Sequence, residues 1–365
     1  MNIFKTRWMC GAILLCLITL TGALTVAQQA STGGPYKVLQ RARVGGEGGW
    51  DYLFADAAGR RLYIPRGTPT RLSIYDLDSL APVGEIPDVS GQGAVVDPKS
   101  GHGFVSGKPV TMFDPKTMKV IKTIDVGEAR PDGIVFDAFN GRVYVFSHPT
   151  KDATVIDAQS GMVLGTIDLG GTPEQGAVDG KGMLYVVMQE AEGSVTAVDV
   201  KTMKATGHYP FGDKGGRCNG LALDAKNEVL FAACGASGTP ADRMKPQMVI
   251  LSAKDGKVLT ALPLAGASDG AAFNPSTMEA FSTHGNGTLT VVKETSPTTF
   301  VVEQNLDTMA GARSITFDAK TNHILTMAQE FGAPPPPAAG APAGPGRGGR
   351  GAAVPGSFTI LAIGK

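Results

Sequence analysis

The sequence predicts an all-β fold built from one repeated unit. The clearest copy is the stretch of residues 130–157, in which Pro-Asp-Gly opens the first of three β-branched or aromatic runs, and Asn-Gly and a polar loop separate the runs. Gly and Pro are abundant, with 49 and 24 residues, as expected for a chain with many turns and few long helices. An acidic or amide residue ends a similar first run seven times, 40 to 50 residues apart, at Asp56, Asp97, Asp137, Asp179, Asp224, Asn274 and Asp318.

Each unit contains enough apolar runs for four strands. An aromatic residue or Leu follows the acidic position by seven residues, or by six in the fourth unit, at Tyr63, Phe104, Tyr144, Tyr185, Phe231, Phe281 and Leu325. A third run and a fourth run follow, as in residues 110–114 and 116–124, or 154–157 and 159–167. Seven four-stranded units of this length predict a seven-bladed β-propeller. A solenoid is the alternative, but antiparallel units of four strands favour radial closure.

The two ends of the chain predict how the ring closes. Residues 36–44 form a fourth-type strand that precedes any complete unit, and residues 357–364 supply a third strand without a fourth. We therefore expect the N-terminal strand to complete the last blade, which removes an open sheet edge.

The repeat motifs carry a family resemblance. PDGIVFD, RVYVF, VID and LYVV resemble the YVTN-type (YncE-like) seven-bladed propeller repeat of secreted bacterial proteins, over residues 36–365. The resemblance implies a protein that binds a ligand or a partner, and one relative is associated with DNA binding. The short fourth unit, the long loop of the fifth unit and an insert in the seventh unit depart from the pattern.

Three segments lie outside the expected blades. Lys5 and Arg7 precede an apolar run that is too short for the ~18–20 residues of a membrane span, so residues 1–27 are expected to be a cleaved secretory signal rather than a retained anchor. Residues 28–35 are expected to be flexible. The Pro/Gly-rich residues 332–356 are expected to form a disordered insert, either a tolerated surface loop or a binding tail.

The mouth of the central channel is the expected site. Inner strands line the channel of a propeller, and the residues just before them are all polar: Asp51, Gln92, Asp132, Gln175, Asn219, Asp269 and Arg313. Such a ring could bind a small polar ligand or, through oxygen ligands, a divalent cation. The alternative is turn chemistry, since Asp, Asn and Gln before a strand often bond the nearby backbone.

The loops between second and third strands reach the same face. They contribute His148 and His284, each placed after a second strand, and also Arg66, Arg71, Lys108, Gln189, Glu190 and Arg243. No closely spaced His pair and no Cys-x-x-Cys is present, so the spacing predicts no metal ligands, and solvated loop residues are the favoured interpretation of both histidines. Asp132 and Asp269 could form an acid–base pair across the pore.

Two cysteines remain beyond the predicted signal. Cys218 precedes the first strand of the fifth unit and Cys234 ends the second, so they come opposite each other if Asp224 pairs near Val229. A disulfide across this hairpin is then expected, with two buried thiols as the alternative.

These features favour a secreted or periplasmic binding protein that is not an enzyme, because no catalytic constellation is recognisable. It would be a monomer that takes an unknown protein or a small polar ligand at the channel mouth. The alternative is a lactonase-like hydrolase with a metal at the channel mouth. Basic and acidic residues are equal at 33 each, which argues against nucleic acid as a partner.

Overall fold

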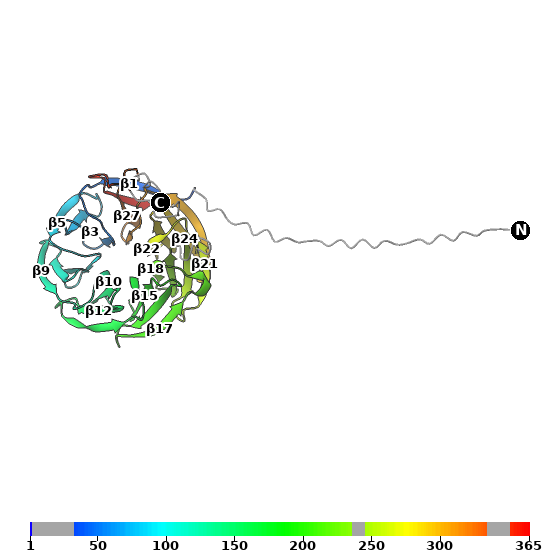
Figure 1. Cartoon of the computed structure of the whole chain (residues 1–365), viewed down its shortest axis with the longest axis horizontal. Coiled ribbons are helices and arrows are strands. Elements are labelled where there is room, and N and C mark those ends of the chain that lie inside the picture. The colour runs from blue at the N-terminus through cyan, green and yellow to red at the C-terminus, as the bar shows by residue number, and fades with distance from the viewer. Residues whose placement is uncertain (2–32, 236–244, 334–350) are drawn as a thin grey trace, which may run out of the picture.

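Seven antiparallel sheets of four strands each form a ring (Figure 1). The structure is a computed structural model that describes Met1 and residues 33–235, 245–333 and 351–365. Within those ranges the only helix is the short η1 (Gly212–Lys214), and no helix is long and apolar enough to cross a membrane. The seven-bladed β-propeller predicted from the repeat is confirmed.

In each blade the first strand faces the channel and the last lies outside. The first four blades are β2 (Phe54–Asp56), β3 (Arg61–Arg66), β4 (Arg71–Asp76) and β5 (Pro82–Pro87); β6 (Ala94–Asp97), β7 (His102–Val105), β8 (Val110–Asp114) and β9 (Lys119–Ile124); β10 (Pro131–Asp137), β11 (Arg142–Ser147), β12 (Asp152–Asp157) and β13 (Val163–Asp168); and β14 (Pro173–Val178), β15 (Met183–Met188), β16 (Ser194–Asp199) and β17 (Lys204–Pro210). The remaining blades are β18 (Cys218–Asp224), β19 (Val229–Cys234), β20 (Gln247–Ser252) and β21 (Val258–Pro263); β22 (Ser268–Asn274), β23 (Glu279–His284), β24 (Thr288–Ser296) and β25 (Thr299–Asp307); and β26 (Ile315–Asp318), β27 (His323–Ala328), β28 (Thr359–Gly364) and β1 (Lys37–Arg43).

The closure predicted from the chain ends is confirmed. β1 pairs antiparallel with β28, from Lys37 opposite Gly364 to Arg43 opposite Thr359. In Figure 1 the blue β1 accordingly lies beside the red C-terminal part of the chain. Just before β1, the Tyr36 hydroxyl donates to the buried Glu279 carboxylate of blade 6, which also accepts from Lys365 Nζ at 2.8 Å. Tyr36 and Lys365 thus meet on one acidic side chain.

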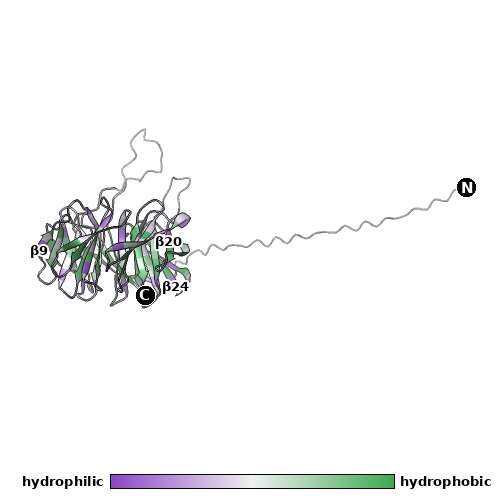
Figure 2. Cartoon of the chain, turned by 90° about the horizontal axis from the view of Figure 1, so that it is seen from below, coloured by the Kyte–Doolittle hydropathy of each residue, from purple (hydrophilic) through white to green (hydrophobic). Residues whose placement is uncertain are grey.

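The hydrophobic core lies between neighbouring blades rather than in one central mass. Leu62 and Tyr75 of blade 1 pack with Leu325 and Ile360 of blade 7, and equivalent clusters fill each other junction. The repeated aromatic or Leu positions of the second strands are all buried there. Seen from the side in Figure 2, green apolar stretches stand beside purple hydrophilic ones along the strands of the disc.

The repeated acidic residues shape the turns at the face opposite the channel mouth. Asp137 is almost fully buried, and its carboxylate accepts the backbone N–H of Phe139 at 3.0 Å; Asp97 and Asp224 bond the following turn in the same way. Similar turns precede the fourth strands, which therefore begin later in the sequence than predicted. Asp114 accepts the N–H of Lys116, so β9 begins at Lys119 rather than at residue 116. β13 likewise begins at Val163 rather than at residue 159.

Parts of the predicted flanking segments lie outside the described residues. These are residues 2–27 of the predicted signal, residues 28–32 of the predicted flexible segment and residues 334–350 of the predicted insert. The described ends of the insert bond each other: Gly332 N–H donates to the Ala352 carbonyl at 2.8 Å, and Val354 N–H donates to the Glu330 carbonyl at 2.9 Å. They extend the β27–β28 hairpin toward the channel-mouth face.

Candidate functional site at the channel mouth

A cavity of about 360 Å³ opens at the channel mouth. Its wall includes the whole predicted ring except Gln175, together with His148: Asp51, Gln92, Asp132, His148, Asn219, Asp269 and Arg313. Arg130, Glu174 and Gln189 also line it. We call this space the acidic hollow, because Asp51, Asp132, Glu174 and Asp269 supply four carboxyl groups.

Glu174 occupies the place that the sequence interpretation gave to Gln175. In blade 3 Pro131 pairs with Ser147, and in blade 4 Pro173 pairs with Met188, so Asp132 and Glu174 are equivalent residues. The first run of the fourth unit is one residue short, and five residues before Asp179 comes Glu174, the offset that holds in every other unit. Counting back from the acidic residue would therefore have found it.

Gln175 binds the channel strands instead of facing the acidic hollow. Its Nε2 donates to the Ala271 carbonyl at 2.9 Å, and its Oε1 accepts the N–H groups of Leu221 and Ala271, both at 3.0 Å. The side chain thus ties the inner strands of blades 4, 5 and 6 together.

His284 is buried inside blade 6 and does not line the acidic hollow. It pairs with Ser268 as the last residue of β23, whereas His148 is the first residue after β11. Because side chains alternate along a strand, this single step turns His284 inward and leaves His148 facing the cavity. The Thr288 hydroxyl lies 2.9 Å from His284 Nδ1, and burial lowers the pKa of His284 to about 4.

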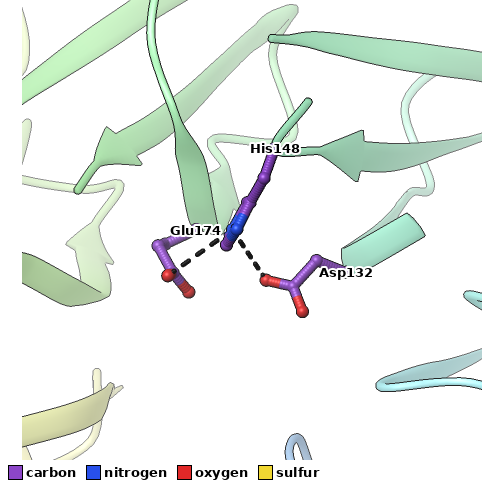
Figure 3. A group of neighbouring side chains, drawn as sticks. All are labelled: Asp132, His148 and Glu174. Carbon is purple, nitrogen blue, oxygen red and sulfur yellow. Dashed lines mark ion pairs between the residues drawn. The ribbon is translucent and has the colours of Figure 1, made fainter. Parts of the chain in front are cut away.

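The centre of the site is a group of three side chains from blades 3 and 4 (Figure 3). His148 Nε2 lies 3.0 Å from Asp132 Oδ2 and 3.5 Å from Glu174 Oε1. These three atoms all lie within 4.8 Å of one another. Asp132 and Glu174 enter from the starts of β10 and β14, so the rigid inner strands fix the carboxylates. Only 13% and 9% of the two acidic side chains is exposed, against 35% for His148.

Neighbouring groups orient Glu174. The Tyr52 hydroxyl donates to its Oε2 at 3.0 Å, and Gln189 Nε2 donates to its Oε1 at 2.5 Å. Burial and the nearby charge of Asp132 raise the pKa of Glu174 to about 8. The close carboxylate of Asp132 raises the pKa of His148, against the effect of burial, and the charge of Glu174 adds to it. At neutral pH Glu174 therefore keeps a proton that an isolated carboxyl group would lose, and His148 keeps its proton to a higher pH than an isolated imidazole.

On the opposite wall of the acidic hollow, side chains of blades 5, 6 and 7 also contact one another. Asn219 Nδ2 donates to Asp269 Oδ1 at 3.1 Å, and Arg313 Nη1 lies 3.0 Å from Asp269 Oδ2. Asp51 stands between the two walls: burial and the charges of Asp132 and Asp269 raise its pKa to about 7. Four carboxyl groups thus share one cavity with few compensating cations.

The three central side chains fit the ligand set of a divalent cation. Two ligands bound at about 2.0–2.1 Å to a tetrahedral zinc ion lie roughly 3.4 Å apart, and the distances from His148 Nε2 to the two carboxylates bracket that value. Imidazole suits Zn²⁺ and other transition metals, and carboxylates suit Mn²⁺ and Mg²⁺. The sequence showed no metal motif because the ligands come from positions 132, 148 and 174, with no short spacing.

The predicted disulfide lies at the same face of the propeller. Cys218 and Cys234 are opposite in the register of β18 and β19 and are disulfide-bonded, and Asp224 pairs with Val229 as expected. The bond lies next to Asn219 of the acidic hollow.

Comparison with known proteins supports the fold alone. No protein-family model matches the chain, and no curated protein matches it. Among solved structures, the chain is similar to the WD40 repeats of RRP9, at 10% identity and a TM-score of 0.69, over 91% of this chain and 99% of that one. A chain of the mitotic checkpoint complex matches at 12% identity and a TM-score of 0.66, over 90% of this chain and 96% of that one. A chain of hydrazine synthase from Kuenenia stuttgartiensis matches at 15% identity and a TM-score of 0.65, over 76% of this chain and 92% of that one.

Proposed function

We propose that this protein is a binding protein that holds a divalent transition-metal cation at its channel mouth and takes a small polar ligand there. The observation that supports this is the convergence of His148 Nε2 with carboxylate oxygens of Asp132 and Glu174 within 4.8 Å. Three protein ligands on one side of an open cavity leave coordination positions for a ligand or water.

The charge balance of the acidic hollow supports a cation. Asp51, Asp132, Glu174 and Asp269 face Arg130, Arg313 and His148, and Arg313 is already paired with Asp269. Crowded carboxyl groups keep protons that a metal ion would displace, which agrees with the raised pKa values of Glu174 and Asp51. The fixed neighbours Tyr52 and Gln189 would hold Glu174 in its ligating orientation.

Calorimetric titration of metal-stripped protein with Zn²⁺ and with Mn²⁺ tests the proposal. We expect one site per chain. His148→Gln and Glu174→Gln each remove one ligand and should weaken binding about 10- to 100-fold or more, since even the outer partners of metal ligands have effects of that order. His208→Gln is the matched control, because His208 is an exposed residue of the outer strand β17. Equal binding by all three variants, or no binding by the wild-type protein, would contradict the proposal.

A hydrolase that uses the same cation is the second candidate. The open cavity favours it, because a cation held by three protein ligands would leave a position at which a water molecule could be activated. Turnover of a panel of lactones and esters by the metal-loaded protein, abolished in Glu174→Gln, would establish the hydrolase. Metal binding without turnover of these substrates would support the binding protein rather than the hydrolase.

We infer further that the chain belongs to the YVTN-type repeat proteins and acts outside the cytoplasm as a monomer. The repeat motifs and the N-terminal apolar run support this inference, and the Cys218–Cys234 disulfide is compatible with an oxidising compartment. Propeller faces commonly carry binding sites on loops held by a rigid scaffold, which fits a ligand or protein partner at the channel mouth.

A further inference from the structure

A second hollow, of about 430 Å³, adjoins the acidic hollow on the same face. The two share Asp51, Gln92, Arg130, Pro131 and Arg313, so they are continuous. The charged residues of the second hollow are mainly cationic: Arg66, Lys108, Arg130 and Arg313 against Asp51. We call it the basic hollow. The channel mouth is therefore divided by charge, with Arg66 and Lys108 of blades 1 and 2 on one side and Asp132 and Glu174 of blades 3 and 4 on the other.

Arg66 breaks the repeat at a buried position. It is the last residue of β3, and the strand registers make it equivalent to the buried residues Gly107, Ser147, Met188, Cys234, His284 and Ala328 of the other blades. Only blade 1 places a permanent charge there. Arg66 is 1% exposed, although a buried Arg in a protein is ordinarily paired with an acidic group.

The contacts of Arg66 leave its charge uncompensated. Nη2 donates to the carbonyls of Glu47 and Gly48 at 2.9 and 3.2 Å, and the guanidinium lies 3.7 Å from the centre of the Phe358 ring. Nε and Nη1 have no hydrogen-bond partner, and no carboxylate pairs with Arg66 among the described residues. Burial lowers the pKa of Arg66 to about 10, so the group remains cationic at neutral pH. A buried charge of this kind costs free energy unless an anion offsets it.

Two further cations stand at the rim of the basic hollow. Lys108 and Arg130 are exposed, and their side chains have no ion pair within the described part of the chain. Arg313 lies between the hollows and is held by Asp269 at 3.0 Å and by the Trp50 carbonyl at 3.2 Å. Arg66 beneath the wall and Lys108 and Arg130 at the rim thus direct a net positive field into one space.

We propose that the basic hollow is an anion subsite, which binds the carboxylate or phosphate group of a small organic anion. The inference rests on the proposed function, because it assigns the ligand of the same channel mouth: the anionic group lies among Lys108 and Arg130 above Arg66, and the other polar atoms of the ligand face His148 and the cation. Lys and Arg donors suit both carboxylate and phosphate oxygens. The division of charge across the mouth fixes the direction in which such a ligand binds.

Titrations of metal-stripped protein with inorganic phosphate and with succinate test the subsite without the cation. We expect the wild-type protein to bind at least one of them, with an affinity that falls as salt is raised. Binding of phosphate alone indicates a phosphate ester, and binding of succinate alone indicates a carboxylate. The double variant Lys108→Ala/Arg130→Ala should weaken binding at least tenfold. Because both residues are exposed, this variant is expected to fold, whereas Arg66→Met requires a folding check.

The double control Lys116→Ala/Lys119→Ala removes the same charge from the other end of blade 2, in the turn and at the start of β9. It should bind the anion as the wild-type protein does. No anion binding by the wild-type protein, or equal losses in the two double variants, would overturn the subsite. Zn²⁺ titrations of the same variants separate the two proposals, since Lys108→Ala/Arg130→Ala should keep the cation site. Anion binding without cation binding would refute the metal site alone.

Discussion

Glu174 is the residue whose protonation most directly links the site to stability and to metal binding. Burial and Asp132 raise its pKa from 4.5 to about 8 in the folded protein, while the unfolded chain keeps the ordinary value. A raised carboxyl pKa means that the folded state binds the proton more tightly. Its stabilising contribution is therefore fully present below pH 4.5 and is lost as the pH rises toward 8.

Substitution of Glu174 by Gln should remove this pH dependence. We expect Glu174→Gln to stabilise the metal-free protein relative to wild type by more than about 1 kcal/mol at pH 9 and by less at pH 5, since one pKa unit corresponds to about 1.4 kcal/mol. Urea unfolding at the two pH values measures the difference. The control Glu128→Gln, on an exposed loop residue, should show no such change. A pH-independent effect of Glu174→Gln would contradict the raised pKa.

Most of the residues that line the channel mouth could be predicted from the sequence, but the contact of His148 with Glu174 at its centre could not. Asp51, Gln92, Asp132, Asn219, Asp269 and Arg313 line the acidic hollow as their repeat position suggested. Gln175 and His284 do not line it, because each is displaced by one residue and side-chain direction changes with every residue of a strand. The contact between His148 and Glu174 depends on how blades 3 and 4 pack side by side. It therefore cannot be inferred from the spacing of the two residues in the sequence.

At the scale of single elements, the hairpin of β18 and β19 supports one wall of the site. Its disulfide joins residues 16 apart, and Asn219 follows Cys218 directly. A covalent loop of about 15 residues stabilises a protein by roughly 3 kcal/mol, chiefly by restricting the unfolded chain. The pairing could be predicted because both cysteines lie on strands whose turn is marked by Asp224 and a short loop.

Cys234→Ser should lower the free energy of unfolding by about 3 kcal/mol. Guanidinium unfolding without reductant measures this, and the wild-type protein with reductant present during unfolding should lose a similar amount. Thiol titration of the unreduced, denatured protein that lacks residues 1–27 should find no free thiol. Two free thiols, or an unchanged unfolding free energy, would contradict the disulfide.

On the scale of the whole molecule, the ring depends on the junction between blades 6 and 7. Tyr36 just before β1, the C-terminal Lys365 and the buried Glu279 meet there, so the two strands that close blade 7 are both tied to blade 6. The spacing of the repeats and the incomplete end units predicted this closure. The hydrogen bond from Tyr36 could not be foreseen, because it joins residues 243 positions apart.

Tyr36→Phe tests this junction while keeping the ring and its T-shaped contact with Phe281. The change leaves one oxygen of buried Glu279 without its donor, so we expect a loss of about 1–3 kcal/mol in the free energy of unfolding. Tyr209→Phe is the matched control, because the Tyr209 hydroxyl has no hydrogen bond in the described structure. Equal unfolding free energies for the two variants would show that the junction does not depend on this bond.

The central proposal is a cation held by Asp132, His148 and Glu174. X-ray diffraction from crystals of the protein grown with Zn²⁺, recorded above and below the zinc absorption edge, tests it most directly. We predict an anomalous peak about 2.0–2.2 Å from His148 Nε2 and from one oxygen of each carboxylate. A map with no peak among these three side chains, or with zinc bound only elsewhere, would contradict the metal site.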